Sequence, residues 1–299
     1  MKHAFLIMAH EQPQILARLL LALQHERVEI FLHIDCGARF TWQEVAVEME
    51  KVAQQPHRSC IHLLQPAQEV HWGDVSQVKI ELRLLAAARE HGDFVHYHWL
   101  SGIDFLLHPV EEILQFFDAH AHQEFIGFWN SPAHQRNVEK RARYYYPFTA
   151  YLRKSRHRLA HQFTTPLRKV ALIAQKLVNY RRFGDESFYK GYNWASITQE
   201  FAEHLLQHRE SILRKYQGVL APDEIYKQTE WMRASLNTQL FDGTNEERGS
   251  QRHIDWERGH PYTFQSENLP ELDKTSVMFA RKVSLDCADA LLKKILVDE

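Results

Sequence analysis

The sequence predicts an α/β fold in which helices cover both faces of a mostly parallel β-sheet. Over the first 130 residues, short apolar runs alternate with longer segments whose apolar residues recur at helical spacing. Strands that alternate with helices form parallel sheets, because each helix carries the chain back to the edge where the previous strand began. With 299 residues, of which 44% are apolar and 25% charged, the chain can bury a large core and has the composition of a soluble globular protein.

The elements expected in this part of the chain follow one another without long gaps. The strands are short runs rich in Ile, Leu, Val and Phe. Among the helices, the third begins at Asp74 or Ser76 and ends before Gly92, while Pro109 begins the fourth. The expected strands cover residues 4–9, 28–35, 60–64, 94–102 and 124–129, and the expected helices cover residues 14–23, 41–53, 74–92 and 109–117.

Several polar residues directly follow the expected strands. They are His10, Asp35, the segment 71–73 with sequence HWG, and Asp104. Because ligands of open α/β sheets bind beyond the carboxyl ends of the strands, these positions are candidates for a ligand site.

A basic segment follows the strand–helix alternation. Residues 135–182 contain thirteen Lys or Arg residues and a single acid, Glu139, and residues 165–183 have the pattern of an amphipathic basic helix. Three interpretations stay open: a solvated helix packed on the sheet, a surface that meets anionic lipid headgroups, or a surface that binds an anionic acceptor. Further helices are expected over residues 199–216 and from Pro222 onward, followed by a loop-rich C-terminal section.

Charge and cysteine content exclude several classes of protein. A net charge of -2 argues against a nucleic-acid partner. Cys36, Cys60 and Cys287 are far apart and form no C-x-x-C pair, which argues against a disulfide framework or a zinc site. The apolar run near the N-terminus is too short for a signal peptide or a membrane span, so we expect a cytoplasmic protein.

Common ligand motifs are missing from the sequence. No G-x-G-x-x-G follows the first expected strand, and no P-loop, G-x-S-x-G or Asp-x-Asp motif occurs. His96 and His98 would face one side of a strand, but no third ligand stands at suitable spacing, so we expect no bound metal. A histidine-based metallohydrolase is therefore kept only as an alternative.

Eight motifs between residues 4 and 283 together resemble glycosyltransferase family 14, the core-2/I-branching β-1,6-N-acetylglucosaminyltransferases and peptide O-xylosyltransferases. The resemblance covers nearly the whole chain apart from the basic segment. It implies a GT-A-like fold, a UDP-sugar donor, inversion at the anomeric carbon and no metal ion. In order, the motifs are AFLIMAHEQPQILARLL, FLHID, VHWGDVSQVKIELRLL, LSGIDFLLHP, YNWASIT, APDEIYKQT, RHIDW and MFARKV.

If no metal ion is bound, positively charged side chains have to stabilise the negative charge of the departing UDP. The motif MFARKV places Arg281 beside Lys282, and in the family the matching basic residues contact the UDP phosphates. Asp35, the acid of FLHID, is expected to contact the uridine. Asp104, the acid of LSGIDF, could instead cap the following turn. The resemblance implies further donor-binding roles for His10, Asp35, Trp72, Gly73 and Asp104, and Arg252 and Arg258 are additional candidates for the phosphates.

Two adjacent acids, Asp223 and Glu224, stand where a helix is expected to begin. Inverting transfer needs a base that removes the proton of the attacking hydroxyl. The glutamate of the family's P-[DA]-E motif falls on Glu224, so the resemblance makes Glu224 the catalytic base. Asp223 is then expected to cap the helix, and capping by both acids is the alternative.

Residues for the acceptor are expected in the second half of the chain. Arg143, Trp194 and Trp256 are the candidates, although Trp194 could equally be a core aromatic. Asn193 stands where the xylosyltransferases have an aspartate, which argues against xylosyl transfer.

Taken together, these features predict a single GT-A-like domain over residues 1–299. Residues 1–130 would bind the nucleotide sugar, residues 131–186 would form the basic insert, and residues 187–299 would contribute the catalytic and acceptor half. We expect a GlcNAc-like sugar to be moved from a UDP-sugar to a glycan or glycolipid acceptor. The chain lacks the N-terminal membrane anchor of animal members, so we expect a bacterial cytoplasmic enzyme with peripheral contact at the inner membrane face. A xylosyltransferase and a non-catalytic binding module on the same fold are the alternatives.

Overall fold

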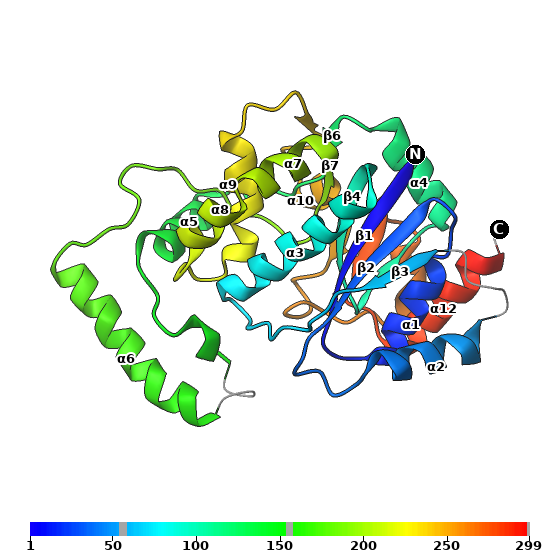
Figure 1. The fold of residues 1–299 in the computed structure, drawn as a ribbon, viewed down its shortest axis with the longest axis horizontal. Coiled ribbons are helices and arrows are strands. Elements are labelled where there is room, and N and C mark those ends of the chain that lie inside the picture. The colour runs from blue at the N-terminus through cyan, green and yellow to red at the C-terminus, as the bar shows by residue number, and fades with distance from the viewer. Residues whose placement is uncertain (54–58, 154–157, 298–299) are drawn as a thin grey trace.

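A five-stranded sheet forms the centre of the molecule, and its strand order is β3-β2-β1-β4-β7. The computed structural model describes residues 1–53, 59–153 and 158–297. The first four strands run parallel, and β7 lies antiparallel beside β4 at one edge. The chain builds the sheet outward from β1 to β3 and then crosses to β4 on the other side of β1, so the strand order reverses between β1 and β4 (Figure 1). The strands are β1 (Lys2–Ala9), β2 (Val28–Ile34), β3 (Cys60–Leu63), β4 (Phe94–Ser101) and β7 (Ser196–Thr198).

Helices cover both faces of this sheet, as the sequence predicts (Figure 1). One apolar cluster packs α1, α2, α4 and α12 against one face, and a second cluster packs α3, α7 and α8 against the other. The expected cap of α3 is confirmed, since the Asp74 side chain accepts the N–H of Ser76 and Gly92 follows the helix. The helices are α1 (Pro13–Ala22), α2 (Trp42–Val52), α3 (Val75–His91), α4 (Val110–Ala119), α7 (Gln199–Gln207), α8 (Arg209–Tyr216) and α12 (Leu285–Val297).

Two small sheets extend the fold beyond the central one. In the first, β5 (Asp104–Leu106) pairs antiparallel with β10 (Phe279–Arg281), which pairs parallel with β9 (Arg252–Ile254). This pairing places Arg281 opposite Asp104, although the two residues are far apart in the chain. In the second, β6 (Gln123–Glu124) pairs with β8 (Gln239–Leu240).

Two of the expected elements differ in the structure. The strand expected over residues 124–129 is wrong in extent: only Gln123–Glu124 forms a strand, and Phe125 makes an isolated bridge to Ser196. The Gly127 carbonyl accepts from the buried Gln228 amide. The helix expected over residues 199–216 is interrupted at His208, which separates α7 from α8.

The basic segment forms α5 (Pro132–Arg143), the short helix η1 (Thr149–Tyr151) and α6 (Arg158–Leu177). In Figure 1, α6 stands apart from the rest of the molecule. The remaining short elements are η2 (Pro222–Glu224), α9 (Tyr226–Arg233), α10 (Glu246–Ser250), η3 (Ser266–Asn268) and α11 (Leu269–Leu272). Within the described ranges, no helix combines the length and apolar character needed to cross a membrane.

Candidate active site

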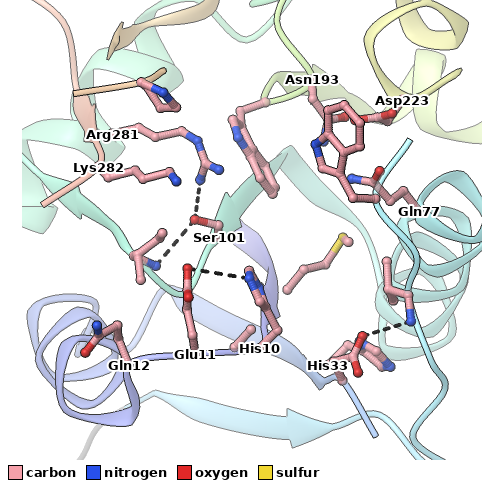
Figure 2. Close-up of a pocket in the computed structure, with 18 of the residues that line it drawn as sticks. His10, Glu11, Gln12, His33, Gln77, Ser101, Asn193, Asp223, Arg281 and Lys282 are labelled. Carbon is pink, nitrogen blue, oxygen red and sulfur yellow. Dashed lines mark hydrogen bonds and ion pairs between the residues drawn. The ribbon is translucent and has the colours of Figure 1, made fainter. Parts of the chain in front are cut away.

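A cavity of about 920 Å³ opens where the strand order reverses, beyond the carboxyl ends of β1 and β4. Its volume is within the range of small-molecule sites, and its position is the one that ligands of open α/β sheets occupy. His10 and Ser101 line it from the ends of these two strands, and Arg281 and Lys282 from β10 and the residue after it (Figure 2). Glu224 lines it from η2.

The cationic wall of the cavity consists of Arg281 and Lys282, whose side chains lie next to each other in Figure 2. The Arg281 guanidinium donates to Asp104 Oδ1 at 2.6 Å and to the Ser101 hydroxyl, and it lies 4.8 Å from the centre of the Trp194 ring. Asp104 is buried behind Arg281, where it also accepts the backbone N–H and the hydroxyl of Ser101 at 2.7 Å each. Asp104 therefore acts by fixing the arginine.

The cationic wall holds more positive than negative charge. Burial, and then the neighbouring Arg281, lower the pKa of Lys282. In the part of the chain that the structure describes, no carboxylate lies within ion-pair distance of Lys282, and Asp104 is the only one paired with Arg281. The N-terminal end of α1, through Gln12 and Pro13, also lines the cavity and adds the positive end of a helix dipole. An anionic group is the natural ligand of this wall.

Glu224 has two cationic partners. Its Oε2 accepts from Arg141 at 2.7 Å and lies 3.0 Å from Lys190 Nζ, which itself stacks 4.0 Å from the centre of the Trp129 ring. The Glu224 side chain is about one quarter exposed, so it is held in place and still open to the cavity. Sequence patterns gave no signal for Lys190 or Trp129.

Asp223 does not have the role that the sequence suggested. Helix α9 begins at Tyr226 after Ile225, which makes no side-chain cap, so the expectation that Asp223 caps this helix is wrong. The short helix η2 instead turns the Asp223 carboxyl inward, beside the cavity. Burial, and then the negative charge of Glu224, raise its pKa to about 8. Asp223 therefore carries a proton at neutral pH.

A buried ion pair lies beneath the acid pair. Lys227 on α9 pairs with Glu81 on α3, and both side chains are fully buried. Lys227 also donates to Asn193 Oδ1 at 3.0 Å, and Tyr226 donates to Glu81 at 2.6 Å. Asn193 lines the cavity, so this network connects the helix behind Glu224 to the cavity surface. Lys227 lies in the motif APDEIYKQT, and this motif is the sequence feature that could have pointed to it.

Asp35 connects two loops at the other side of the cavity. Its Oδ1 accepts the N–H of Gly37 at 2.7 Å, and its Oδ2 accepts the N–H of Val70 at 2.8 Å. Beneath it lies His33, for which burial lowers the pKa to about 4, so this ring is neutral at physiological pH. The cavity here is shaped by backbone groups that the Asp35 carboxylate holds together.

Trp72 and His10 line the cavity near Asp35, whereas Gly73 supports it from outside. Trp72 is half-exposed, and the Arg153 guanidinium lies 5.3 Å from the centre of its ring. His10 is an exposed residue whose Nε2 lies 3.5 Å from Glu11 Oε1. Gly73 has a φ of 74°, a left-handed conformation that favours glycine, and its carbonyl accepts the N–H of Ala221 just ahead of the acid pair.

Of the three candidates for acceptor binding, the structure places two in the cavity and one outside it. Trp194 and Trp256 line the cavity, and Trp256 packs against the ring of Trp129 with their centres 6.3 Å apart. Arg143 lies outside the cavity, because its guanidinium is occupied by Glu139 at 2.6 Å and by the carbonyls of residues 184 and 186. The acceptor role expected for Arg143 is therefore not supported.

The two additional arginine candidates also lie elsewhere. Arg252 is fully buried against Ser196, and Arg258 pairs with Asp255 and Glu271 on the surface. Neither lines the cavity. Two other arginines, Arg39 and Arg153, do line it, although no motif marked them.

The histidines of the expected strand pair are part of the core. His98 Nε2 lies 3.1 Å from His3 Nδ1, and burial lowers the pKa of His96 to about 3. Across the residues that the structure covers, no group of three or more His, Cys, Asp or Glu side chains is placed to hold a metal ion.

The structure combines a doubly covered α/β sheet with a ligand-sized cavity where the strand order reverses. A cationic wall and an acid both face this cavity. This combination is typical of the class of proteins that bind anionic, nucleotide-like ligands. A comparison with protein families gives a match to the family described as Core-2/I-Branching enzyme over residues 3–277. The chain belongs to this family and is a glycosyltransferase, with a nucleotide-sugar donor and a glycan acceptor. The matched region ends before Arg281. A comparison with curated proteins gave no match.

Proposed function

We propose that the protein is an inverting, metal-independent glycosyltransferase that moves a GlcNAc-like sugar from a UDP-sugar to a hydroxyl of a glycan. The observation that carries this proposal is the shared cavity, in which Arg281, fixed by Asp104, and Lys282 line the same space as Glu224. Glu224 can accept a proton, and Arg281 and Lys282 can stabilise negative charge. Inverting transfer needs both functions at the same time.

Arg281 and Lys282 are proposed to stabilise the negative charge of the departing diphosphate. The bond between the anomeric carbon and the diphosphate oxygen breaks, and its electron pair leaves with UDP. Cationic groups that are already oriented stabilise this charge without having to reorganise. Arg281 satisfies that condition, because Asp104, Ser101 and Trp194 hold its guanidinium before any ligand arrives.

Glu224 is proposed to act as the base. An acceptor hydroxyl attacks the anomeric carbon from the face opposite the diphosphate, and its proton passes to the Glu224 carboxylate. Arg141 and Lys190 both contact Oε2, so Oε1 is the oxygen that would take the proton. The protonated Asp223 adds no second negative charge beside it at neutral pH.

The acceptor that we propose is a glycan or glycolipid of a bacterial cell surface, met by a cytoplasmic enzyme in peripheral contact with an anionic membrane. Trp256 and Trp194 offer apolar ring faces in the cavity on which sugar rings can stack. The Asn193 amide, whose oxygen is bound by Lys227, provides no carboxylate for the role that an aspartate has in xylosyltransferases. Transfer of a GlcNAc-like sugar is therefore favoured over xylosyl transfer.

The test is a panel of UDP-sugars assayed for slow hydrolysis without acceptor, with and without EDTA. The wild type is expected to hydrolyse one UDP-sugar at the same rate in both. Glu224→Gln is expected to bind UDP normally and to lose about 10²- to 10⁴-fold of the transfer rate to an acceptor, which is the usual contribution of a general base. Glu210→Gln, at an exposed acid on α8, is the matched control. Unchanged transfer by Glu224→Gln would contradict its role as the base. No hydrolysis and no transfer by the wild type would favour the non-catalytic binding module, and activity only with added metal would contradict metal independence.

A further inference from the structure

Helix α6 has its polar and apolar faces reversed relative to an ordinary surface helix. It has no buried residue and stands apart from the sheet and its covering helices (Figure 1). The half-buried residues of the helix are five polar and three apolar ones: His161, Thr164, Thr165, Arg168 and Gln175, with Ala160, Ala171 and Leu172. Gln175 bonds to both backbone groups of Tyr145, and His161 bonds to the carbonyl of Tyr151. A mostly polar side therefore faces the protein.

The opposite side of α6 is a continuous apolar stripe that faces solvent. Its members follow one another at intervals of three or four residues, so they share one face of the helix. Their exposed fractions lie between 55% and 82%, and soluble proteins seldom leave a patch of this kind uncovered. The apolar stripe consists of Leu159, Phe163, Leu167, Val170, Ile173 and Leu177.

The charge around the apolar stripe identifies the partner. No Asp or Glu occurs between Lys140 and Gly184, whereas exposed basic residues accompany the helix along its length. They are Arg158, Lys169, Lys176 and Arg181. A second copy of the chain packed on the stripe would bring two such basic surfaces together and would be repelled. An anionic bilayer offers acyl chains to the apolar stripe and negative headgroups to the basic residues.

We propose that α6 lies in the headgroup layer of an anionic membrane, with its apolar stripe directed toward the acyl chains. Two residues that precede α6 in the chain, Ala150 in η1 and Arg153, line the cavity of the active site. Binding through α6 would therefore hold the cavity close to the bilayer. That consequence, delivery of a lipid-linked acceptor, rests on the proposed function, whereas membrane binding itself does not.

The test is sedimentation of the full chain with vesicles of phosphatidylcholine, with and without phosphatidylglycerol, at low and high salt. We expect binding to the anionic vesicles that high salt weakens but does not abolish. The variant Phe163→Gln/Leu167→Gln/Ile173→Gln is expected to lose roughly tenfold or more of this binding, since insertion scales with buried apolar area. Lys169→Gln/Lys176→Gln is expected to lose several-fold, and only on anionic vesicles. Val47→Gln, at an exposed apolar position on α2, should bind as the wild type does.

Three outcomes would overturn the proposal. The first is wild-type vesicle binding by the triple variant. The second is equal binding of the wild type to neutral and anionic vesicles, and the third is a dimer in solution that the triple variant abolishes. Hydrolysis of the UDP-sugar in solution, measured on the same preparations, shows that each variant is folded. It also separates failure of membrane binding from failure of the proposed enzyme activity.

Discussion

At the scale of single residues, the site depends on how the structure prepares each charged group. Arg281 has a buried carboxylate, a hydroxyl and an indole ring around it, so its position is determined before any ligand binds. Glu224 is similarly held by Arg141 and Lys190. A charged group that is already oriented contributes more to a charge-separating reaction than one that has to be ordered during the reaction.

Removing the charge behind Arg281 tests whether its orientation matters. In Asp104→Asn the guanidinium keeps a hydrogen-bond acceptor but loses its ion pair. We expect the KM for the UDP-sugar to rise about tenfold, as loss of a charge-assisted bond predicts. Steady-state kinetics would measure this, with thermal unfolding as the check on folding. An unchanged KM in a folded variant would mean that Asp104 has no positioning role.

The proton on Asp223 predicts how activity depends on pH. Because its pKa is raised to about 8, a second negative charge forms beside Glu224 as the pH rises through that value. We expect wild-type kcat/KM to change near pH 8 and Asp223→Asn, whose amide cannot ionise, to lack that change. Since a raised carboxyl pKa costs stability above the ordinary value, Asp223→Asn should also unfold at a higher temperature at pH 8. An identical pH profile for both proteins would contradict this assignment.

At the scale of secondary structure, three elements that are distant in the chain build the site. Strand β10 brings Arg281 beside β5, η2 presents Glu224, and α9 fixes the position of η2 by pairing Lys227 with Glu81 on α3. The loop that contains Gly73 meets the backbone of Ala221 immediately before η2. Glu224, the proposed base, is thus placed by contacts with the helix and loop that follow β3.

Breaking the buried Lys227–Glu81 pair is expected to destabilise the protein. Lys227→Met leaves the Glu81 charge in the core without its partner, which typically costs about 3–5 kcal/mol of unfolding free energy. Urea denaturation would measure the loss. The double variant Lys227→Met/Glu81→Leu should recover much of it, because it leaves neither charge buried alone. If the double variant is as unstable as the single one, the pair is not the source of the effect.

At the scale of the whole molecule, buried ionisable groups determine how stability depends on pH. Four core histidines have lowered pKa values, so between pH 6.5 and 5 the unfolded chain binds protons there that the folded chain does not. Three buried acids have raised pKa values and act in the opposite direction over the same range. The histidines are His3, His33, His96 and His98, and the acids are Glu124, Asp223 and Glu230.

Because the histidines outnumber the acids, we expect the unfolding free energy to fall as the pH is lowered from 6.5 to 5. Each unbalanced proton contributes about 1.4 kcal/mol per pH unit, so the fall should reach about 2 kcal/mol. Urea denaturation at intervals of half a pH unit would measure it. A constant or rising stability over this range would show that the core histidines do not remain neutral in the fold.

The sequence predicts the frame of the molecule better than the details of its site. The first four strands follow from local periodicity, which a single sequence contains, whereas the reversal of strand order between β1 and β4 is seen only in the fold. The pairing of Arg281 with Asp104 depends on a strand contact between distant segments, and the inward turn of Asp223 depends on the short helix η2. The pattern of α6 shows that it is amphipathic, but only the fold shows that its apolar side faces outward.

The central claim is that Arg281 and Lys282, rather than a metal ion, hold the diphosphate. The most direct measurement is calorimetric binding of UDP and of uridine, in EDTA, to the wild type, Arg281→Gln and Lys282→Gln. We predict that the wild type binds UDP without metal and that each variant loses about 10- to 100-fold of UDP affinity while binding uridine normally. The claim would be contradicted if UDP bound only with added divalent metal, or if both variants bound UDP as tightly as the wild type.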